Sequence, residues 1–345
     1  MHTPRQTAKF RYLWSFTPSL FVLAGNVLGG HWAWGNMAYS LGFLVILDFF
    51  VPVSSDENKD SDNRLPDLML VLASFLHLTC IVSLIYGIHT DTLSGSFVWY
   101  AASSTGLNAG MLGITVAHEL IHRKSRLFKW LGIADLLLVC YGHFYIEHRF
   151  GHHARVGTLA DPATARLGEG FYRYLLRSVP AQWWSALHLE ASRLKRVNLF
   201  PFGLSNYTLR ITVAEILIFM VLWQVFSSIA AWAWLMQSMV AFFLLEYVNY
   251  MQHYGLVRKP GEKVEAHHSW NSNTFLSRFF LFELSRHSHH HQDARVPYHL
   301  LNTNAASKMQ PCGYFGCFYA GLIPPIWFRL MNPAVEKAGQ TLKEG

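Results

Sequence analysis

Histidine residues in this chain gather in four short motifs: HELIH at 118–122, EHRFGHH at 147–153, NYMQHYG at 249–255 and RHSHHH at 286–291. Neutral imidazole is the usual protein ligand for zinc, copper, iron and nickel. The motifs offer nine candidate metal ligands: His118, His122, His148, His152, His153, His253, His287, His290 and His291. Because a zinc ion takes three or four protein ligands, nine imidazoles predict two metal ions.

The spacing within the motifs predicts which ligands share an ion. Residues four apart lie on one face of a helix, so His118 and His122 are expected to bind the same metal. His148 and His152 repeat this spacing, whereas His153 is rotated by about 100° and suits the neighbouring ion.

The other two motifs extend the same pattern. His287, His290 and His291 are spaced i, i+3, i+4, which again places them on one helix face. His253 is a single histidine. It is included as a candidate ligand because Asn249 lies one turn before it, at the end of an apolar run that would place His253 beside the other histidines.

Three alternatives use the same residues differently. HELIH fits the HExxH motif of zinc proteases, with Glu119 as the base, but a protease would leave about six clustered histidines unused. A metal transporter would bind its cargo near the middle of the bilayer in broken helices, whereas these motifs lie at span ends and beyond. A soluble carboxylate-bridged di-iron bundle would use Glu-x-x-His pairs, which do not dominate here.

The composition is typical of a membrane protein. Hydrophobic residues make up 52% of the chain and charged residues 14%, against about 25% charged residues in soluble domains. A transmembrane helix needs about 20 apolar residues. Six stretches meet this requirement: 13–30, 32–52, 66–88, 97–119, 209–226 and 229–251. The predicted fold class is therefore an all-α membrane protein of one domain, with a cap formed by 120–207 and 253–345.

The positions of Lys and Arg predict the orientation. Neither residue occurs in 12–58, 65–122 or 211–257, so the three turns inside these stretches carry no positive charge. Under the positive-inside rule both termini and all four histidine motifs are cytoplasmic. The net charge of +7 flanks the spans instead of forming a soluble basic patch, which argues against nucleic-acid binding.

Other segments are assigned from their composition. The polar run at 54–63 is a solvated loop, and the apolar stretch at 127–146 is expected at the interface or under the cap, because a seventh crossing would separate EHRFGHH from HELIH. The stretch at 312–331 contains Pro324 and Pro325 and is expected to be a re-entrant or docking element. No cleavable signal peptide is evident. The four cysteines form no CxxC pair, so neither a disulfide framework nor an iron–sulfur site is expected.

Six longer motifs resemble the membrane-bound alkane 1-monooxygenases, also called alkane omega-hydroxylases: HELIHRK, GHFYIEHRFGHHARV, DPATAR, NYMQHYGL, HHSWNSN and RHSHHHQDARVPYHLL. That family is similar to xylene monooxygenase hydroxylase subunits and, more distantly, to membrane fatty-acid desaturases. The resemblance implies six transmembrane helices with a histidine-rich di-iron cap, and its ligands correspond to the nine histidines named above.

The resemblance also implies a reaction. Two iron ions would activate O2, the co-substrate, and one oxygen atom would enter a terminal methyl group of a medium-chain alkane to give a primary alcohol. The protein would take this hydrophobic substrate from the lipid bilayer of a bacterial-type inner membrane.

Electrons would come from an external rubredoxin or ferredoxin with an NAD(P)H reductase, because the chain has no dinucleotide motif and no cysteine ligand set. A candidate docking face for this carrier consists of basic residues: Arg173, Arg177, Arg193, Lys195 and Arg196. Attraction of these residues to anionic lipid is the alternative.

Two departures from the family pattern bear on the substrate. Alkane hydroxylases typically have Glu at the position of Gln252, and the Gln of this chain is more similar to the xylene-type subunits. Alkane hydroxylases also usually have Asp at the position of His289. A linear alkane, an alkylbenzene methyl group and a terpenoid methyl group are therefore all candidate substrates.

Carboxylates are expected close behind the metal ligands. Nine neutral ligands leave the charge of two iron ions uncompensated, and metal-bound imidazoles usually donate their second N–H to a carboxylate or carbonyl. The candidates are Glu119, Glu147, Asp161, Glu246 and Glu283. Glu246 is notable because a carboxylate within a span is costly and usually functional.

The remaining histidines and aromatic residues are assigned less specific roles. His143, His267 and His268 are expected to support the site or the fold without binding metal. Trp34, Phe43 and Phe49 fit a lipid-facing or core position as well as a channel wall.

Overall fold

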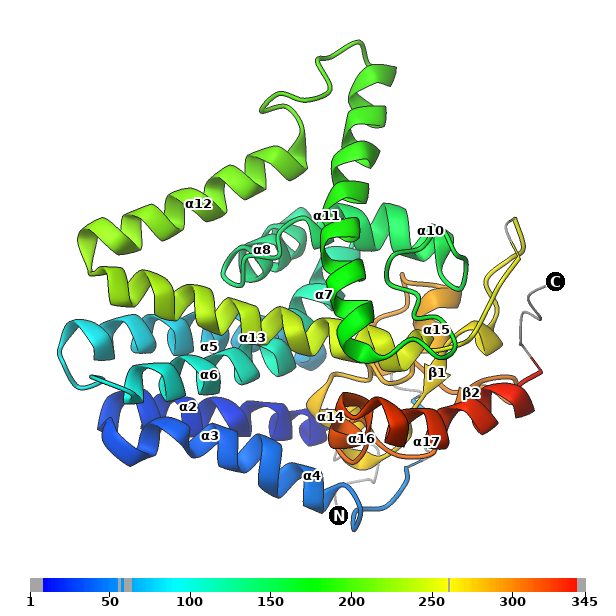
Figure 1. Cartoon of the computed structure of the whole chain (residues 1–345), viewed down its shortest axis with the longest axis horizontal. Helices are drawn as coiled ribbons and strands as arrows, with labels where there is room; N and C mark the ends of the chain where they lie inside the picture. The colour runs from blue at the N-terminus through cyan, green and yellow to red at the C-terminus, as the bar shows by residue number, and fades with distance from the viewer. Residues whose placement is uncertain (1–8, 55–56, 59–63, 260, 340–345) are drawn as a thin grey trace.

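The structure of the protein is a computed structural model that describes residues 9–54, 57–58, 64–259 and 261–339. The terminal residues, including Gly345, and most of the predicted polar loop at 54–63 lie outside these ranges. The described part of the chain is mostly helical, with the helices of a bundle lying side by side and a cap of shorter elements at one end (Figure 1).

The bundle begins with a hairpin built from short helical segments. In chain order these are η1 (Lys9–Phe16), α2 (Thr17–Leu28), η2 (Gly30–Trp34), α3 (Gly35–Met37), the π-helix η3 (Ala38–Phe43) and α4 (Leu44–Leu47). The helix α5 (Arg64–His89) follows as one element. The next run consists of α6 (Phe97–Asn108), the π-helix η4 (Ala109–Ile114) and α7 (Thr115–His122), which ends at the HELIH motif.

Two long helices complete the bundle, and side chains cap both. Asn206 accepts hydrogen bonds from the backbone N–H groups of Thr208 and Leu209 and so starts α12 (Tyr207–Val225). Ser227 accepts a hydrogen bond from the N–H of Ala230 and starts α13 (Ser228–His253). The last residue of α13, His253, lies in the cap.

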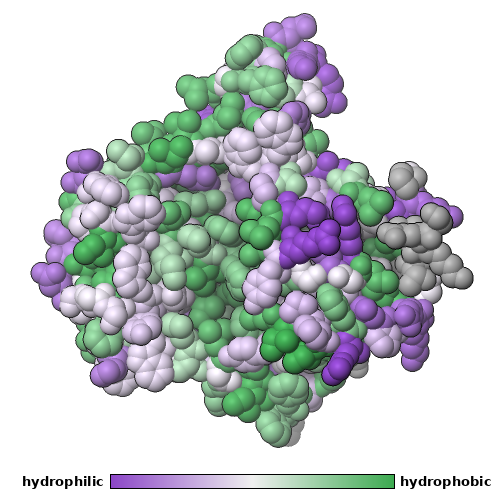
Figure 2. All heavy atoms as spheres, viewed as in Figure 1, coloured by the Kyte–Doolittle hydropathy of each residue, from purple (hydrophilic) through white to green (hydrophobic). Residues whose placement is uncertain are grey.

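The membrane prediction is confirmed in part. Among the described residues, three helices are long and apolar enough to cross a membrane: α5, α12 and α13. The predicted spans at 13–30, 32–52 and 97–119 are divided by 3-10 and π segments, so no single helix there reaches the length of a span. Figure 2 shows hydrophobic side chains across the bundle and strongly hydrophilic ones gathered over the cap and at the outer end of α11.

The cap contains many short elements and one long helix. They are α8 (Arg126–Leu137), α9 (Phe144–Ile146), the π-helix η5 (Glu147–His152), α10 (His153–Arg155), α11 (Phe171–Arg196), η6 (Ala266–His268), β1 (Trp270–Asn271), α14 (Phe275–Phe280), α15 (His287–Gln292), η7 (Tyr298–Leu300), β2 (Lys308–Met309), α16 (Phe318–Leu322) and α17 (Pro324–Lys337). The two strands pair in parallel, with Trp270 opposite Lys308 and Asn271 opposite Met309.

Glycines let the helical run that leads to α7 pack closely on α13. A Cβ at Gly106 would lie 2.5 Å from the backbone oxygen of Gln237, and one at Gly110 would lie 2.9 Å from the Cβ of Leu244. Small residues at such crossings allow two helix backbones to approach each other. This contact brings the helix that carries His118 beside the helix that carries His253.

The segment at 312–331 begins with a closed loop and continues into α16 and α17. Cys312 and Cys317 form a disulfide and close a short loop, a pairing that the sequence analysis did not predict. Their Cα atoms lie 5.7 Å apart, which is an ordinary separation for a disulfide. Pro324 and Pro325 occupy the first turn of α17, where proline costs no helical hydrogen bond.

Candidate metal centre

The nine predicted histidine ligands come together as two adjacent groups. His118, His122, His148, His153 and His290 form the first group, and His152, His253, His287 and His291 form the second. One ligand atom from each residue lies within 4.8 Å of the others in its group. These two sets are called group 1 and group 2 below.

The ring nitrogens of each group point at one another. In group 1 the Nε2 atom of His118 lies 2.8 Å from that of His290 and 3.1 Å from that of His148. In group 2 the Nε2 atom of His287 lies 3.0 Å from that of His253 and 2.9 Å from that of His291. With metal–nitrogen bonds of about 2.1 Å, two nitrogens at right angles around one ion lie about 3 Å apart. Each group therefore has the spacing of imidazoles that share an ion.

A second observation tests the fit of a metal ion. The Nε2 atom of His122 is buried and has no hydrogen-bond partner among the described residues. A buried polar atom without a partner is costly, and a metal ion in group 1 would satisfy it.

The partition between the groups corrects two predicted pairings, and the first lies in the EHRFGHH motif. His148 and His152 were expected to share an ion, but His148 belongs to group 1 with His153, whose Nε2 atom is 3.0 Å away, and His152 belongs to group 2. The reason is the π-helix η5, which spans Glu147–His152. A π-helix has i→i+5 hydrogen bonds and appears mostly as a single turn at functional sites, so here the pair that meets is five residues apart.

The helix α15 contributes to both groups from one short turn. The spacing i, i+3, i+4 predicted that His287, His290 and His291 act together, but the structure divides them: His287 and His291 enter group 2, whereas His290 enters group 1. A buried cluster of charged side chains precedes this helix. Glu283 accepts hydrogen bonds from Arg278 at 2.7 and 2.8 Å and lies 3.4 Å from Arg286. The cluster anchors the chain just before the RHSHHH motif.

The electrostatics of the cap favour the ligand form of imidazole. Burial lowers the pKa of His287, His290 and His291 well below the usual value, and the neighbouring imidazoles lower it further. Metal binding requires neutral histidine, so fewer protons compete with a metal at these residues.

Asp161 is the one predicted carboxylate that contacts a histidine of either group. Its Oδ2 atom lies 2.9 Å from the Nδ1 atom of His152, and it also accepts a hydrogen bond from Thr164 at 2.7 Å. Burial raises the pKa of Asp161, but the nearby His152, the hydrogen bond from Thr164 and the more distant His253 together outweigh this effect, so the pKa lies below its ordinary value. An anionic Asp161 orients the ring of His152 so that Nε2 faces group 2.

The other predicted carboxylates bind different partners. Glu119 pairs with Arg123 at 2.8 Å and accepts the backbone N–H of Tyr298. Glu147 pairs with Arg155 at 2.7 Å. Both lie within the histidine motifs, but their side chains stabilise the surrounding cap.

Glu246 is fully buried and is held by neutral donors from three parts of the chain. These donors are Tyr141, Tyr174, Ser178, Gln182 and Asn249, at 2.8–3.4 Å. Three of the five lie on α11, so Glu246 fastens this cap helix to α13.

The remaining histidines lie outside both groups. His289 is half-buried, and its Nδ1 atom accepts the backbone N–H of Asn302 at 2.9 Å. His268 accepts the N–H of Glu265 through its Nδ1 atom, and His267 lies 3.5 Å from the carboxylate of Glu265. His143 is buried beside the ring of Tyr141.

Sequence reasoning missed a buried polar network next to η4. The Nδ1 atom of His77 on α5 lies 3.2 Å from Asp135 on α8, and Ser74 donates to the same carboxylate at 2.6 Å. A Cβ at Gly113 would lie 2.6 Å from the His77 ring. The signal was available, because charged residues within apolar stretches are rare and usually paired.

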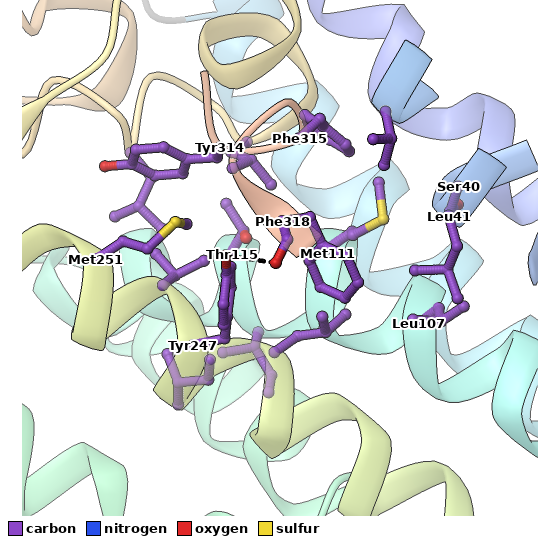
Figure 3. Close-up of a pocket in the computed structure, with 18 of the residues that line it drawn as sticks. Ser40, Leu41, Leu107, Met111, Thr115, Tyr247, Met251, Tyr314, Phe315 and Phe318 are labelled. Atoms are coloured by element: carbon purple, nitrogen blue, oxygen red, sulfur yellow. Dashed lines mark hydrogen bonds between the residues drawn. The ribbon is translucent and has the colours of Figure 1, made fainter. Parts of the chain in front are cut away.

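An apolar cavity adjoins group 1. It is lined by residues from η3, α4, α6, η4, α7, α13 and the segment 281–318, and His118 is one of them. Figure 3 shows Met251 and Tyr247 of α13 across the cavity from Tyr314 and Phe315. Trp34, Phe43 and Phe49 do not line this cavity and are exposed on the bundle.

The predicted docking residues fall into two kinds. Arg177 pairs with Glu169 and Arg193 pairs with Glu190, so these two charges are largely compensated. Arg173, Lys195 and Arg196 are exposed on α11.

The helical bundle and the two histidine groups are typical of a membrane-associated protein with two clusters of candidate metal ligands. The family described as fatty acid desaturase matches residues 94–320. An alkane 1-monooxygenase from Ectopseudomonas oleovorans is 32% identical over 353 residues, with 96% of this chain and 86% of that protein covered. The chain belongs to the fatty acid desaturase family and, within it, to the alkane 1-monooxygenases.

Two further relatives bear on the range of substrates. Alkane 1-monooxygenase 1 of Pseudomonas aeruginosa is 38% identical over 238 residues, which cover 68% of this chain and 62% of that protein. The xylene/toluene monooxygenase hydroxylase component XylM of Pseudomonas putida is 30% identical over 322 residues, which cover 90% of this chain and 84% of that protein. The relatives therefore include hydroxylases named for alkanes and for alkylaromatics.

Proposed function

We propose that this protein is an O2-dependent non-haem di-iron monooxygenase that hydroxylates a terminal methyl group of a medium-chain alkane to a primary alcohol. The observation that carries the proposal is the pair of histidine groups at the end of an apolar cavity, with His118 belonging to both features. The names of the relatives supply the reaction class.

The two groups would hold one iron ion each. Group 1 offers five imidazoles and group 2 offers four, and Asp161 adds one negative charge behind His152. Bound iron would supply the oxygen chemistry that no amino-acid side chain can perform. Burial in the cap keeps the imidazoles neutral, and Asp161 orients His152 through its second ring nitrogen.

The cavity would select the position of reaction. Its walls are almost entirely apolar, so a hydrocarbon can leave the lipid and enter without losing hydrogen bonds. A chain that enters end-on presents its terminal methyl group to His118 first. Selectivity for this group then comes from positioning, although internal C–H bonds are weaker.

The proposal also includes the source of electrons and the orientation of the protein in the membrane. A rubredoxin or ferredoxin with its reductase would dock on the cytoplasmic side, where Arg173, Lys195 and Arg196 are exposed on α11. The six-span arrangement in the inner membrane, with both termini and the cap cytoplasmic, follows from the charge pattern of the sequence.

A second substrate class has its own support. Similarity to XylM and the presence of Gln252 keep methyl hydroxylation of an alkylaromatic or terpenoid as the alternative. A zinc protease or a transporter fits less well, because nine imidazoles in two groups exceed what one zinc ion uses.

The test is product analysis in cells that express the chain with an electron-transfer system. Octane, hexadecane, toluene and p-cymene are supplied in parallel, and we expect 1-octanol as the main product from octane. The purified protein should hold about two irons per chain, by the ligand count of the two groups.

The controls separate the metal site from general damage. His118→Ala, His152→Ala, His253→Ala and His290→Ala should each abolish activity, whereas His188→Ala, at an exposed histidine outside both groups, should not. One zinc per chain without iron would favour the protease. Benzylic alcohol without 1-octanol would keep the mechanism and change the substrate.

A further inference from the structure

One wall of the cavity is a short segment that several side chains hold in place. Residues 312–318 contribute Tyr314, Phe315 and Phe318 to the cavity. The hydroxyl of Tyr247 on α13 donates to the backbone oxygens of Cys317 and Phe318 at 2.9 and 2.8 Å, the second of which is drawn in Figure 3. The segment is therefore fastened to α13, which forms the opposite wall.

Gln252 makes a second connection, and it lies closer to the metal groups. This residue directly precedes His253 of group 2 and is 1% exposed. Its Nε2 atom donates to the hydroxyl oxygen of Tyr314 at 3.0 Å and to the backbone oxygen of Leu284 at 3.2 Å. Because a backbone oxygen can only accept, the NH2 end of the amide must face it, and the two bonds use both amide hydrogens.

Both partners of Gln252 line the cavity. Leu284 lies three residues before His287 of group 2, and Tyr314 lies on the segment 312–318. One carboxamide thus connects two wall residues to α13 beside a predicted metal ligand.

We propose that Gln252 is a positioning residue that determines which carbon of the substrate is oxidised, by fixing the width of the cavity at its metal end. The inference rests on the proposed hydroxylase function. With both bonds in place, Tyr314 and Leu284 are held close to α13 and only a narrow chain end reaches His118. Without them this part of the wall can retreat, and the carbon next to the methyl group gains access.

The test compares three variants with the wild-type protein in the membrane, with octane as the substrate. Gln252→Met keeps an unbranched side chain of similar length but removes both donors. Tyr314→Phe keeps the ring and removes the acceptor of one bond. Gln224→Met makes the same substitution at an exposed glutamine near the end of α12 and serves as the matched control.

We expect Gln252→Met to raise the ratio of 2-octanol to 1-octanol by about threefold to tenfold, the size of effect that one or two hydrogen bonds can have. Tyr314→Phe should raise the same ratio by a smaller factor, and the double variant should exceed Gln252→Met only slightly, because the changes share one bond. Iron content should stay at the wild-type value, and Gln224→Met should match the wild type in both readouts.

An unchanged product ratio in active Gln252→Met and Tyr314→Phe proteins would overturn the role of Gln252. So would a loss of iron that parallels the loss of activity, because Gln252 would then act on the metal site itself. If Gln252→Met does not accumulate, the ratio given by Tyr314→Phe decides. A wild-type protein that forms no alcohol from any hydrocarbon would instead contradict the proposed function.

Discussion

At the scale of single residues, proximity in the sequence did not decide which carboxylate supports the histidines. Glu119 and Glu147 adjoin histidines along the chain and bind arginines, whereas Asp161 lies nine residues after His152 and contacts its ring. Only the last arrangement can fix the orientation of an imidazole.

Asp161→Asn is expected to lower iron affinity or activity by about tenfold to a hundredfold, the usual effect of removing the partner of a metal-bound histidine. The amide keeps the size of the side chain but loses the charge that His152 faces. Iron retention against a chelator, measured together with turnover, checks this. Asp91→Asn, in an exposed turn, is the control, and equal retention by the two variants would refute the role of Asp161.

Glu283→Gln should destabilise the protein by about 3–5 kcal/mol, because it leaves buried arginines without their anion. Arg278 and Arg286 both lie next to Glu283, and each is 1% exposed. Thermal unfolding in detergent measures the effect, and Glu336→Gln, on the exposed side of α17, should unfold like the wild type. A similar unfolding temperature for both variants would show that the cluster contributes little.

At the scale of elements, three π segments in the described part of the chain lie at the site. The segments η3 and η4 contribute residues to the cavity wall, and η5 divides its histidines between the two groups. Each π turn carries an extra residue and changes the direction of the side chains that follow. The contact between the run α6–η4 and α13 then brings His118 towards His253.

Gly106→Ala should weaken this contact. Its new Cβ would meet the backbone of Gln237 and the side chain of Val240, and overpacking of this kind costs about 1–3 kcal/mol. We expect a lower unfolding temperature and less bound iron. Gly42→Ala, where a Cβ would meet nothing within 4 Å, is the matched control and should be at least as stable as the wild type, since alanine restricts the unfolded chain.

At the scale of the whole molecule, the charge pattern predicts the orientation in the membrane. Reporter fusions at Gly345 and within 54–63 should give a cytoplasmic signal, and a fusion in the turn near Leu93 a periplasmic one, because the turns inside the Lys- and Arg-free stretches are exported. A fusion at 197–205, in the cap, is the internal control for the cytoplasmic side. A periplasmic signal at Gly345 would rule out the six-span arrangement.

The sequence by itself determined which histidines gather and which long helices are apolar. Imidazole spacing, long apolar stretches and the absence of charge within them are local properties, and they identified the histidines of both groups and the helices α5, α12 and α13. Tertiary structure decided which side chains face each other. The π-helix η5 separated His148 from His152, and chain folding paired His77 with Asp135, 58 residues further along the chain. Periodicity assumes a regular helix and cannot anticipate a π turn, and a partner distant in sequence leaves no local pattern, so these contacts exist only once the chain has folded.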